Sequence, residues 1–237
     1  MSRTYVIYGV SKGLGQAILQ AVPQQEDRIF GISRSEPSYL HPGFQWISAD
    51  LSQPELARDM VKKQIQNQQV DYLIYNVGIW EEKAFEPDYD FENCSDTEIS
   101  RLLHTNVHAC ILAIQSLLEN LRLSSNAKII LIGSTWGLDN HNGAEVSFSA
   151  SKFALRGMVH ALRQSLRKDQ IGISILNLGY LATEFDINTP LDTVLAETEA
   201  QLIPLQDVLA AIRFILATSR ASCVKEINMP AMADLHI

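Results

Sequence analysis

The chain has few cysteines, an excess of negative charge and no long apolar run, and each feature excludes a class of protein. Its three cysteines among 237 residues are odd in number and widely spaced, which argues against a disulfide framework and for a reducing compartment. With 19 Lys and Arg against 27 Asp and Glu, a net charge of −8 and no basic run, nucleic acid and anionic membrane surfaces are poor partners. No apolar stretch is long enough to span a bilayer, and no signal-like segment follows Met1. We therefore expect a soluble cytoplasmic protein that binds neither nucleic acid nor membrane.

What the sequence does contain is an alternation of short apolar runs and amphipathic helical segments. This alternation predicts an α/β fold: a doubly wound, mostly parallel seven-stranded sheet with helices on both faces, of the Rossmann type. The predicted strands are 5–8, 28–33, 44–48, 71–76, 128–133, 172–177 and 224–229, and the predicted helices are 14–22, 55–66, 96–121, 145–168 and 204–219. We expect residues 1–237 to form a single dinucleotide-binding domain, with the stretch lacking clear periodicity at about 183–203 as a short substrate lid.

A glycine-rich turn joins the first strand to the first helix, with the spacing Gly9-x-x-x-Gly13-x-Gly15. Gly9 permits a backbone conformation that side chains disfavour, Gly13 lets the main chain approach a pyrophosphate, and Gly15 lets the helix pack closely on its strand. The free N–H groups at the start of the helix then face the anion. Such a turn can also be a plain connection, but the flanking strand and helix favour a phosphate-binding site.

Further along the chain, short motifs follow the predicted strands in a fixed order. They are Ala-Asp-Leu at 49–51, Tyr-Asn-Val-Gly at 75–78, a lone Asn106 in the apolar stripe of helix 96–121, Gly-Ser-Thr-Trp-Gly at 133–137, Phe-Ser-Ala-Ser-Lys at 148–152 and Leu-Gly-Tyr-Leu-Ala-Thr at 178–183. Together with the glycine turn, this ordered set resembles the short-chain dehydrogenase/reductase family over essentially the whole chain. The resemblance implies hydride transfer between a nicotinamide dinucleotide and a small-molecule substrate, in a homodimer or homotetramer.

The resemblance also implies the site residues. The catalytic positions are Ser134, Lys152, Asn106 and Phe148, the last standing where the family has its Tyr. The cofactor-binding positions are Gly9, Ser11, Lys12, Gly13, Leu14, Gly15, Arg34, Asp50, Leu51, Asn76, Gly78, Lys152, Gly179, Leu181 and Thr183. In the family scheme the Ser holds the carbonyl oxygen, the Lys binds the nicotinamide ribose and lowers the pKa of the Tyr, and the Asn links the Lys to solvent through water.

Three of these assignments have simpler alternatives. Ser134 fits a strand-end hydroxyl that bonds local backbone, Asn106 fits a core polar group, and Thr183 fits a cap on the following segment. His104 and His108 have a spacing that a metal could use, but no carboxylate completes the set, so no metal site is predicted.

Phe148 is the main departure from the family pattern, because it has no proton to give. It lies four residues before Lys152, so both project from one helix face, and Lys152 keeps its role on the ribose. Loss of general acid catalysis typically slows a reaction ~10²–10⁴-fold. Positioning of the reactants lowers the activation barrier by ~7–11 kcal/mol, which is a larger effect. An enzyme that keeps the positioning but lacks the acid can therefore still act as a slow reductase. The proton could come from water held by Ser134, or from Tyr180, Glu145 or His141. A deliberate Tyr-to-Phe substitution would give the same sequence.

The choice of dinucleotide depends on the end of the second strand, where an acidic residue would bind the 2′-hydroxyl of NAD. The sequence there is Ser33-Arg34-Ser35, and Arg34 offers a bidentate donor for a phosphate. Lys12, next to Gly13 in the glycine turn, adds a second cation near the expected phosphate site. These residues favour NADP(H); the alternative is that both are solvated surface charges.

The leading hypothesis is an NADP(H)-dependent oxidoreductase with an altered or weakened proton donor, reducing a small carbonyl substrate. One competitor is a low-turnover NADP(H)-binding protein that acts as a sensor, partner or scaffold. Another is an enzyme that uses the same pocket for conjugate reduction or elimination, which needs no phenol.

Overall fold

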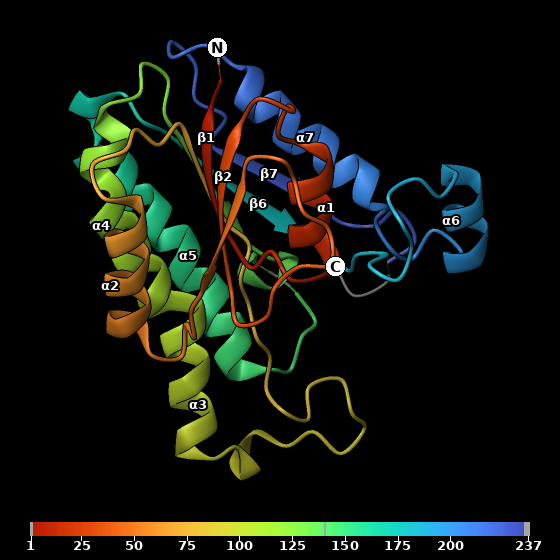
Figure 1. The fold of residues 1–237 in the computed structure, drawn as a ribbon. Coiled ribbons are helices and arrows are strands. Elements are labelled where there is room, and N and C mark those ends of the chain that lie inside the picture. Colours follow the sequence, from red (N-terminus) through yellow and green to blue (C-terminus); the bar gives the residue numbers. More distant parts are fainter. Residues whose placement is uncertain (1, 140, 235–237) are drawn as a thin grey trace.

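A single parallel sheet of seven strands runs through residues 2–139 and 141–234, which the computed structural model describes (Figure 1). The strands are β1 Thr4–Tyr8, β2 Arg28–Ser33, β3 Phe44–Ser48, β4 Tyr72–Tyr75, β5 Lys128–Ile132, β6 Gly172–Leu178 and β7 Glu226–Met229. Their order in the sheet is β3-β2-β1-β4-β5-β6-β7, and every pairing is parallel. The predicted fold class is confirmed.

The order in which successive strands join the sheet reverses at β1, which pairs with β2 on one side and with β4 on the other. Crossovers leave such a sheet toward opposite faces, which opens a crevice at the carboxyl ends of the strands. This topological switch point places the glycine turn after β1 beside the loop after β4.

Helices cover both faces of the sheet. They are α1 Gly13–Ala21, α2 Pro54–Ile65, α3 Asp96–Leu103, α4 Ala109–Arg122, α5 Val146–Ser165, α6 Leu191–Thr198 and α7 Leu205–Ala217. In Figure 1, α2, α4 and α5 lie on one side of the sheet and α1 and α7 on the other. Each side buries its own apolar cluster, as expected for a sheet enclosed between two helical layers.

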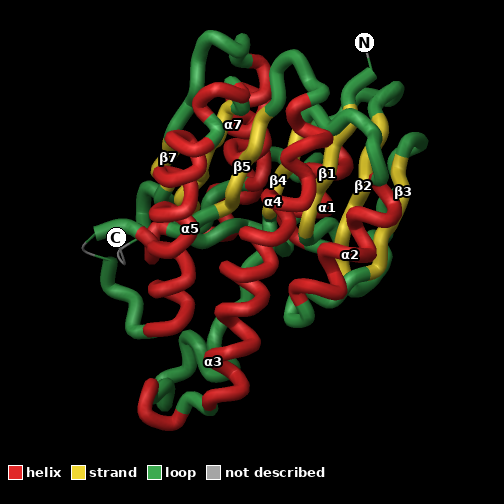
Figure 2. Tube along the Cα trace, turned by 90° about the vertical axis from the view of Figure 1, so that its left-hand side faces the viewer, coloured by secondary structure: helices red, strands yellow, loops and turns green. Residues whose placement is uncertain are grey.

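The predicted helix 96–121 has an interruption that the sequence analysis did not foresee. A π-helical turn, His104–His108, separates α3 from α4 and contains Asn106. Such turns insert one extra residue and often occur at functional sites. Figure 2 shows α3 extending past the sheet, beyond the edge at which the strands end.

The stretch at 183–203 is not irregular throughout, which corrects one expectation. It contains the helix α6, Leu191–Thr198, which begins after Pro190 and buries only Val194. A short helix with so little buried apolar surface gives a weak periodic signal, which is why the sequence analysis missed it. Within residues 2–139 and 141–234, no helix is both long and apolar enough to cross a membrane.

Candidate active site

A cleft of about 1110 Å³ lies along the carboxyl edge of the sheet. All of the predicted site residues line it except Gly15 and Asn106. Its walls come mainly from the segments after β1, β2, β3, β4, β5 and β6, together with Phe148 and Lys152 of α5. Residues that are far apart in sequence therefore meet in one continuous space. The cleft also includes Arg101 and Glu184, which the sequence analysis did not single out.

The glycine turn is held in place by backbone contacts that leave no room for side chains. Gly9 has φ +83°, and a Cβ on it would lie 2.2 Å from the carbonyl oxygen of Asn76. Gly15 lies behind the cleft rather than in its wall, and a Cβ on it would lie 1.7 Å from the carbonyl oxygen of Gly9. The predicted packing role of Gly15 accordingly has a direct steric cause. The Asn76 amide donates to the Gly9 carbonyl at 3.2 Å and fixes the turn.

The first turn of α1 fits an anion. Its N-terminal residue Gly13 has φ +53°, the preceding Lys12 gives no side-chain cap, and no acidic residue lies in the first turn. The first N–H groups of the helix are therefore available, and the helix dipole favours negative charge there. A Cβ on Gly13 would lie 3.4 Å from Thr183, so the bare backbone widens the cleft at this point. A dinucleotide pyrophosphate suits this cradle.

The two cations of the predicted nucleotide end, Lys12 and Arg34, both line the cleft. Arg34 directly follows β2 and is exposed, so its guanidinium is open to solvent and to a ligand. Asp50 lines the same region, and its carboxylate accepts a hydrogen bond from the Ser52 N–H at 3.0 Å. This end therefore combines two positive charges with a carboxylate that is anchored by its own loop.

Ser134, Phe148 and Lys152 meet at the other end of the cleft. Lys152 is buried, and its Nζ donates to the Ile132 carbonyl at 3.2 Å. Burial lowers the pKa of this ammonium to about 8. The Ser134 hydroxyl accepts from the Trp136 N–H at 3.2 Å, the local backbone contact expected of a strand-end serine, yet the residue still lines the cleft. Gly78 leaves room for the ammonium, since a Cβ there would lie 3.0 Å from Nζ.

Asn106 lies outside the cleft wall and is fully buried. Its Oδ1 accepts from the Ile79 N–H at 2.8 Å, and its Nδ2 donates to the Ile79 carbonyl at 2.9 Å and to Ser151 Oγ at 3.1 Å. The side chain therefore pins the loop after β4 to α5. This geometry matches the alternative in which Asn106 is a core polar group with its hydrogen bonds satisfied. Besides the backbone of Ile79, it bonds one side chain, that of Ser151.

Aromatic rings gather at the end of the cleft that holds Phe148. The Trp80 and Phe148 rings are stacked, with centroids 3.3 Å apart and planes 12° apart. Trp136 meets Trp80 edge-on at 5.0 Å, and Phe85 contacts Trp80 at 4.5 Å and Tyr180 at 5.7 Å. Trp80, Phe148 and Tyr180 line the cleft itself, while Trp136 supports them from behind. The pocket is therefore apolar with few polar groups, as small-molecule sites usually are.

Two buried carboxylates next to this aromatic cluster were not predicted as a pair. Glu81 Oε1 accepts from the N–H groups of Ser147 and Phe148 at 2.7 and 3.1 Å. Glu145 Oε1 accepts from the Phe85 N–H at 3.0 Å. Both carboxylates hold the loop after β4 against the start of α5. The sequence indicates only Glu145, and only as a candidate proton donor, because contacts between distant segments leave no local pattern.

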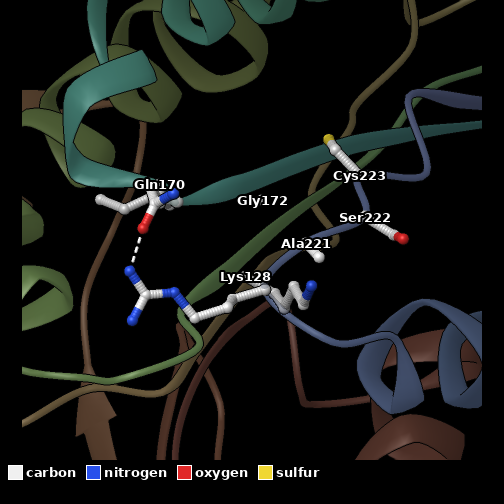
Figure 3. Close-up of a pocket in the computed structure, with 8 residues that line it drawn as sticks. Lys128, Gln170, Gly172, Ala221, Ser222 and Cys223 are labelled. Atoms are coloured by element: carbon white, nitrogen blue, oxygen red, sulfur yellow. Dashed lines mark hydrogen bonds between the residues drawn. The ribbon is translucent and has the colours of Figure 1, made fainter.

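A smaller pocket of about 150 Å³ lies at the opposite edge of the sheet, where β5 and β6 begin (Figure 3). Lys128, which lines it, is buried and donates to Thr218 Oγ1 at 3.0 Å and to the Ser219 carbonyl at 3.3 Å, just past the end of α7. A cation is favourable at a helix C-terminus, so this lysine has a structural role. The pocket lies at the far end of the strands from the glycine turn.

The fold and the cleft together define a Rossmann-type nucleotide-binding protein. More specifically, the chain belongs to the short chain dehydrogenase family, whose family model matches residues 3–193. Its relatives include the acetoacetyl-CoA reductase of Acinetobacter sp., which is 27% identical over 207 residues, covering 84% of this chain and 79% of that protein. A 3-oxoacyl-(acyl-carrier-protein) reductase of Escherichia coli is 21% identical over 227 residues, covering 91% of this chain and 90% of that protein.

Solved structures agree on the fold. An active-site complex of Pseudomonas aeruginosa RhlG with NADP has a TM-score of 0.80 at 21% identity, covering 99% of this chain and 96% of that one. A short chain dehydrogenase family protein from Francisella tularensis has a TM-score of 0.77 at 23% identity, covering 96% and 97%.

Proposed function

We propose that this protein is an NADP(H)-dependent oxidoreductase that reduces a small carbonyl substrate with an altered proton donor. One observation carries the proposal: a single cleft joins the glycine cradle and Arg34 at one end to Ser134 and Lys152 at the other. The reductases among its relatives support the reaction class.

NADP(H) is the dinucleotide that the charges of the cleft favour. A 2′-phosphate at the end of β2 would meet Arg34, with Lys12 nearby and no acidic side chain directly after the strand. The glycine turn and the N–H groups of α1 would hold the pyrophosphate, and Asp50 the adenine. The NADP complex of RhlG supports the same choice.

The catalytic end of the cleft has a hydroxyl that can bind the substrate, on Ser134, and a cation, on Lys152. It lacks the tyrosine that serves as the general acid in the family. When bound, the reduced nicotinamide supplies a hydride. Ser134 holds the carbonyl oxygen, and Lys152 binds the ribose hydroxyls from its buried position. Phe148 stands at the position of the family Tyr and contributes only an apolar surface against Trp80. The proton must then come from another group.

The proposal extends to the whole chain and its assembly. Residues 1–237 form a single dinucleotide-binding domain. Within it, the stretch from Thr183 to about residue 203, which includes α6, acts as a short substrate lid. The protein works as a homodimer or homotetramer, as family members typically do.

Titration with NADPH, followed by fluorescence, and measurement of its oxidation with a panel of small ketones and 3-oxoacyl thioesters test the function. We expect binding and slow oxidation. Restoring the phenol with Phe148→Tyr should raise carbonyl reduction at least about tenfold, well within the worth of a general acid. Binding without turnover in both proteins would instead identify a low-turnover NADP(H)-binding protein. Oxidation of conjugated substrates alone would identify a conjugate reductase.

A further inference from the structure

The structure distinguishes between the side chains that could replace the missing phenol. His141 is already engaged: its Nδ1 accepts from the Gly143 N–H at 3.1 Å, and its Nε2 lies 2.9 Å from Ser149 Oγ. Its ring stacks on Trp136, with centroids 6.0 Å apart, and does not line the cleft. A proton on His141 therefore has no direct route to a bound carbonyl.

Glu145 is also withdrawn from the cleft. It is 4% exposed, one carboxylate oxygen accepts from the Phe85 N–H at 3.0 Å, and it is not part of the cleft wall. Its contact with Phe85 holds the loop after β4, so its geometry is that of a structural anchor.

Tyr180 alone among the three lines the cleft, together with Ser134, Phe148 and Lys152. It lies two residues past the end of β6, and its backbone is fixed because its carbonyl accepts from the Ile203 N–H at 2.8 Å. Its ring is half-buried and packs against the cluster that contains Phe148. A fixed backbone and a packed ring give the phenol a defined position at the substrate end.

We propose that the Tyr180 phenol donates the proton to the substrate oxygen, in place of the phenol that Phe148 lacks; this inference rests on the proposed function. The carbonyl carbon receives the hydride from the reduced dinucleotide, and the π electrons of the C=O bond move to the oxygen. That oxygen takes the proton of Tyr180, whose O–H electron pair stays on the phenolate. A water molecule entering the cleft then gives a proton to the phenolate, which restores the phenol, and the hydroxide that remains leaves to the solvent. The carbonyl is reduced to an alcohol, and the dinucleotide is oxidised.

The surroundings of Tyr180 make it a weak acid. Burial raises its pKa to about 12, and the charges of Glu145 and Asp234 act in the same direction. The phenol therefore stays protonated at neutral pH and still protonates an alkoxide, which is a stronger base. Because a general acid works best when its pKa is near the working pH, the reaction should be slower than with the family's usual Tyr.

The test compares Tyr180→Phe with the wild type in NADPH oxidation and in NADPH binding. We expect turnover to fall about 100-fold, within the usual worth of a general acid, while the Kd for NADPH stays within twofold. Tyr39→Phe removes the hydroxyl of a half-buried tyrosine outside the cleft and is the matched control, with unchanged turnover expected.

Repeating the Tyr180→Phe substitution in a Phe148→Tyr background distinguishes proton donation by Tyr180 from a purely structural role. There the restored phenol takes over, so Tyr180→Phe should cost less than about threefold. This inference would be overturned if Tyr180→Phe lowered turnover equally in both backgrounds. It would also be overturned if Tyr180→Phe in the wild-type background kept more than a third of the turnover. Either result would leave the proposed function standing. Absence of turnover in the wild type itself would overturn both.

Discussion

The Glu81 carboxylate accepts a hydrogen bond from the backbone N–H of Phe148 at 3.1 Å, across 67 residues of sequence. The same oxygen accepts from the Ser147 N–H at 2.7 Å, so a side chain of the loop after β4 caps the first turn of α5. A carboxylate is also favoured by the dipole at a helix N-terminus. The helix that carries Phe148 and Lys152 is thereby fixed to the loop that carries Trp80.

Replacing Glu81 should destabilise the protein strongly. Glu81→Leu leaves two N–H groups without their acceptor, which should cost about 2–4 kcal/mol in the free energy of unfolding, measured by urea denaturation. Glu82→Gln is the matched control, because Glu82 is exposed and its ion pair with Arg101 should contribute less than about 1 kcal/mol. Equal losses in the two variants would contradict the capping role.

Two glycines should respond to alanine in opposite directions. Gly15→Ala places a Cβ against the Gly9 carbonyl and should lower stability and weaken NADPH binding by more than about tenfold, since the turn must shift. Gly157→Ala, at an exposed position in α5 with no atom within 4 Å of the added Cβ, should raise stability by about 0.5–1 kcal/mol. Thermal unfolding and fluorescence titration measure both effects. A Gly15→Ala protein with unchanged stability would disprove the close packing.

Arg34 should set the preference between the two dinucleotides. Arg34→Ala should weaken NADPH binding about 10–100-fold, the worth of a charge-assisted bidentate contact, and leave NADH binding nearly unchanged. Arg58→Ala, an arginine of α2 that lies outside the cleft and is paired with Asp59, is the control and should change neither affinity. Parallel losses for both dinucleotides would show that Arg34 does not contact a 2′-phosphate.

Lys152 should make stability depend on pH. Its pKa of about 8 in the folded protein lies below the ordinary lysine value, so the unfolded chain binds more protons between about pH 8 and 10. The contribution of Lys152 to the free energy of unfolding should therefore rise with pH across this window, by up to about 3 kcal/mol, whereas the raised pKa of the buried Cys110 thiol acts in the opposite direction. Urea denaturation of the cofactor-free protein at several pH values measures the rise. Lys152→Met should remove this contribution, so the difference in free energy of unfolding between wild type and variant should change with pH across the window; a difference that does not depend on pH would contradict the assignment.

Much of the sheet could be predicted because the five inner strands are short apolar runs that are buried on both faces. Val6, Ile74 and Ile130 are completely buried. Strands of a parallel sheet that are covered on both faces appear in the sequence as continuous apolar runs. The cleft followed from the same logic, since motifs such as 75–78 and 178–183 come directly after strands and the strand ends meet at one edge.

The features that could not be predicted depend on contacts between distant segments. Glu81 resembles any loop carboxylate until α5 is brought next to it. The π-helical turn contains Asn106, whose side chain bonds the backbone of Ile79 in a distant loop, whereas the local sequence shows only a polar interruption. The packing role of Gly15 was predicted from the glycine motif, but its place behind the cleft wall required the position of Gly9.

The stacked pair of Trp80 and Phe148 gives the protein a built-in optical reporter. Two of the three tryptophans, Trp80 and Trp136, lie in the aromatic cluster around Phe148, so much of the intrinsic emission originates there. A compound that enters between the rings must change their separation, and with it the emission spectrum. Libraries of ketones and thioesters can accordingly be screened by fluorescence before any turnover is known.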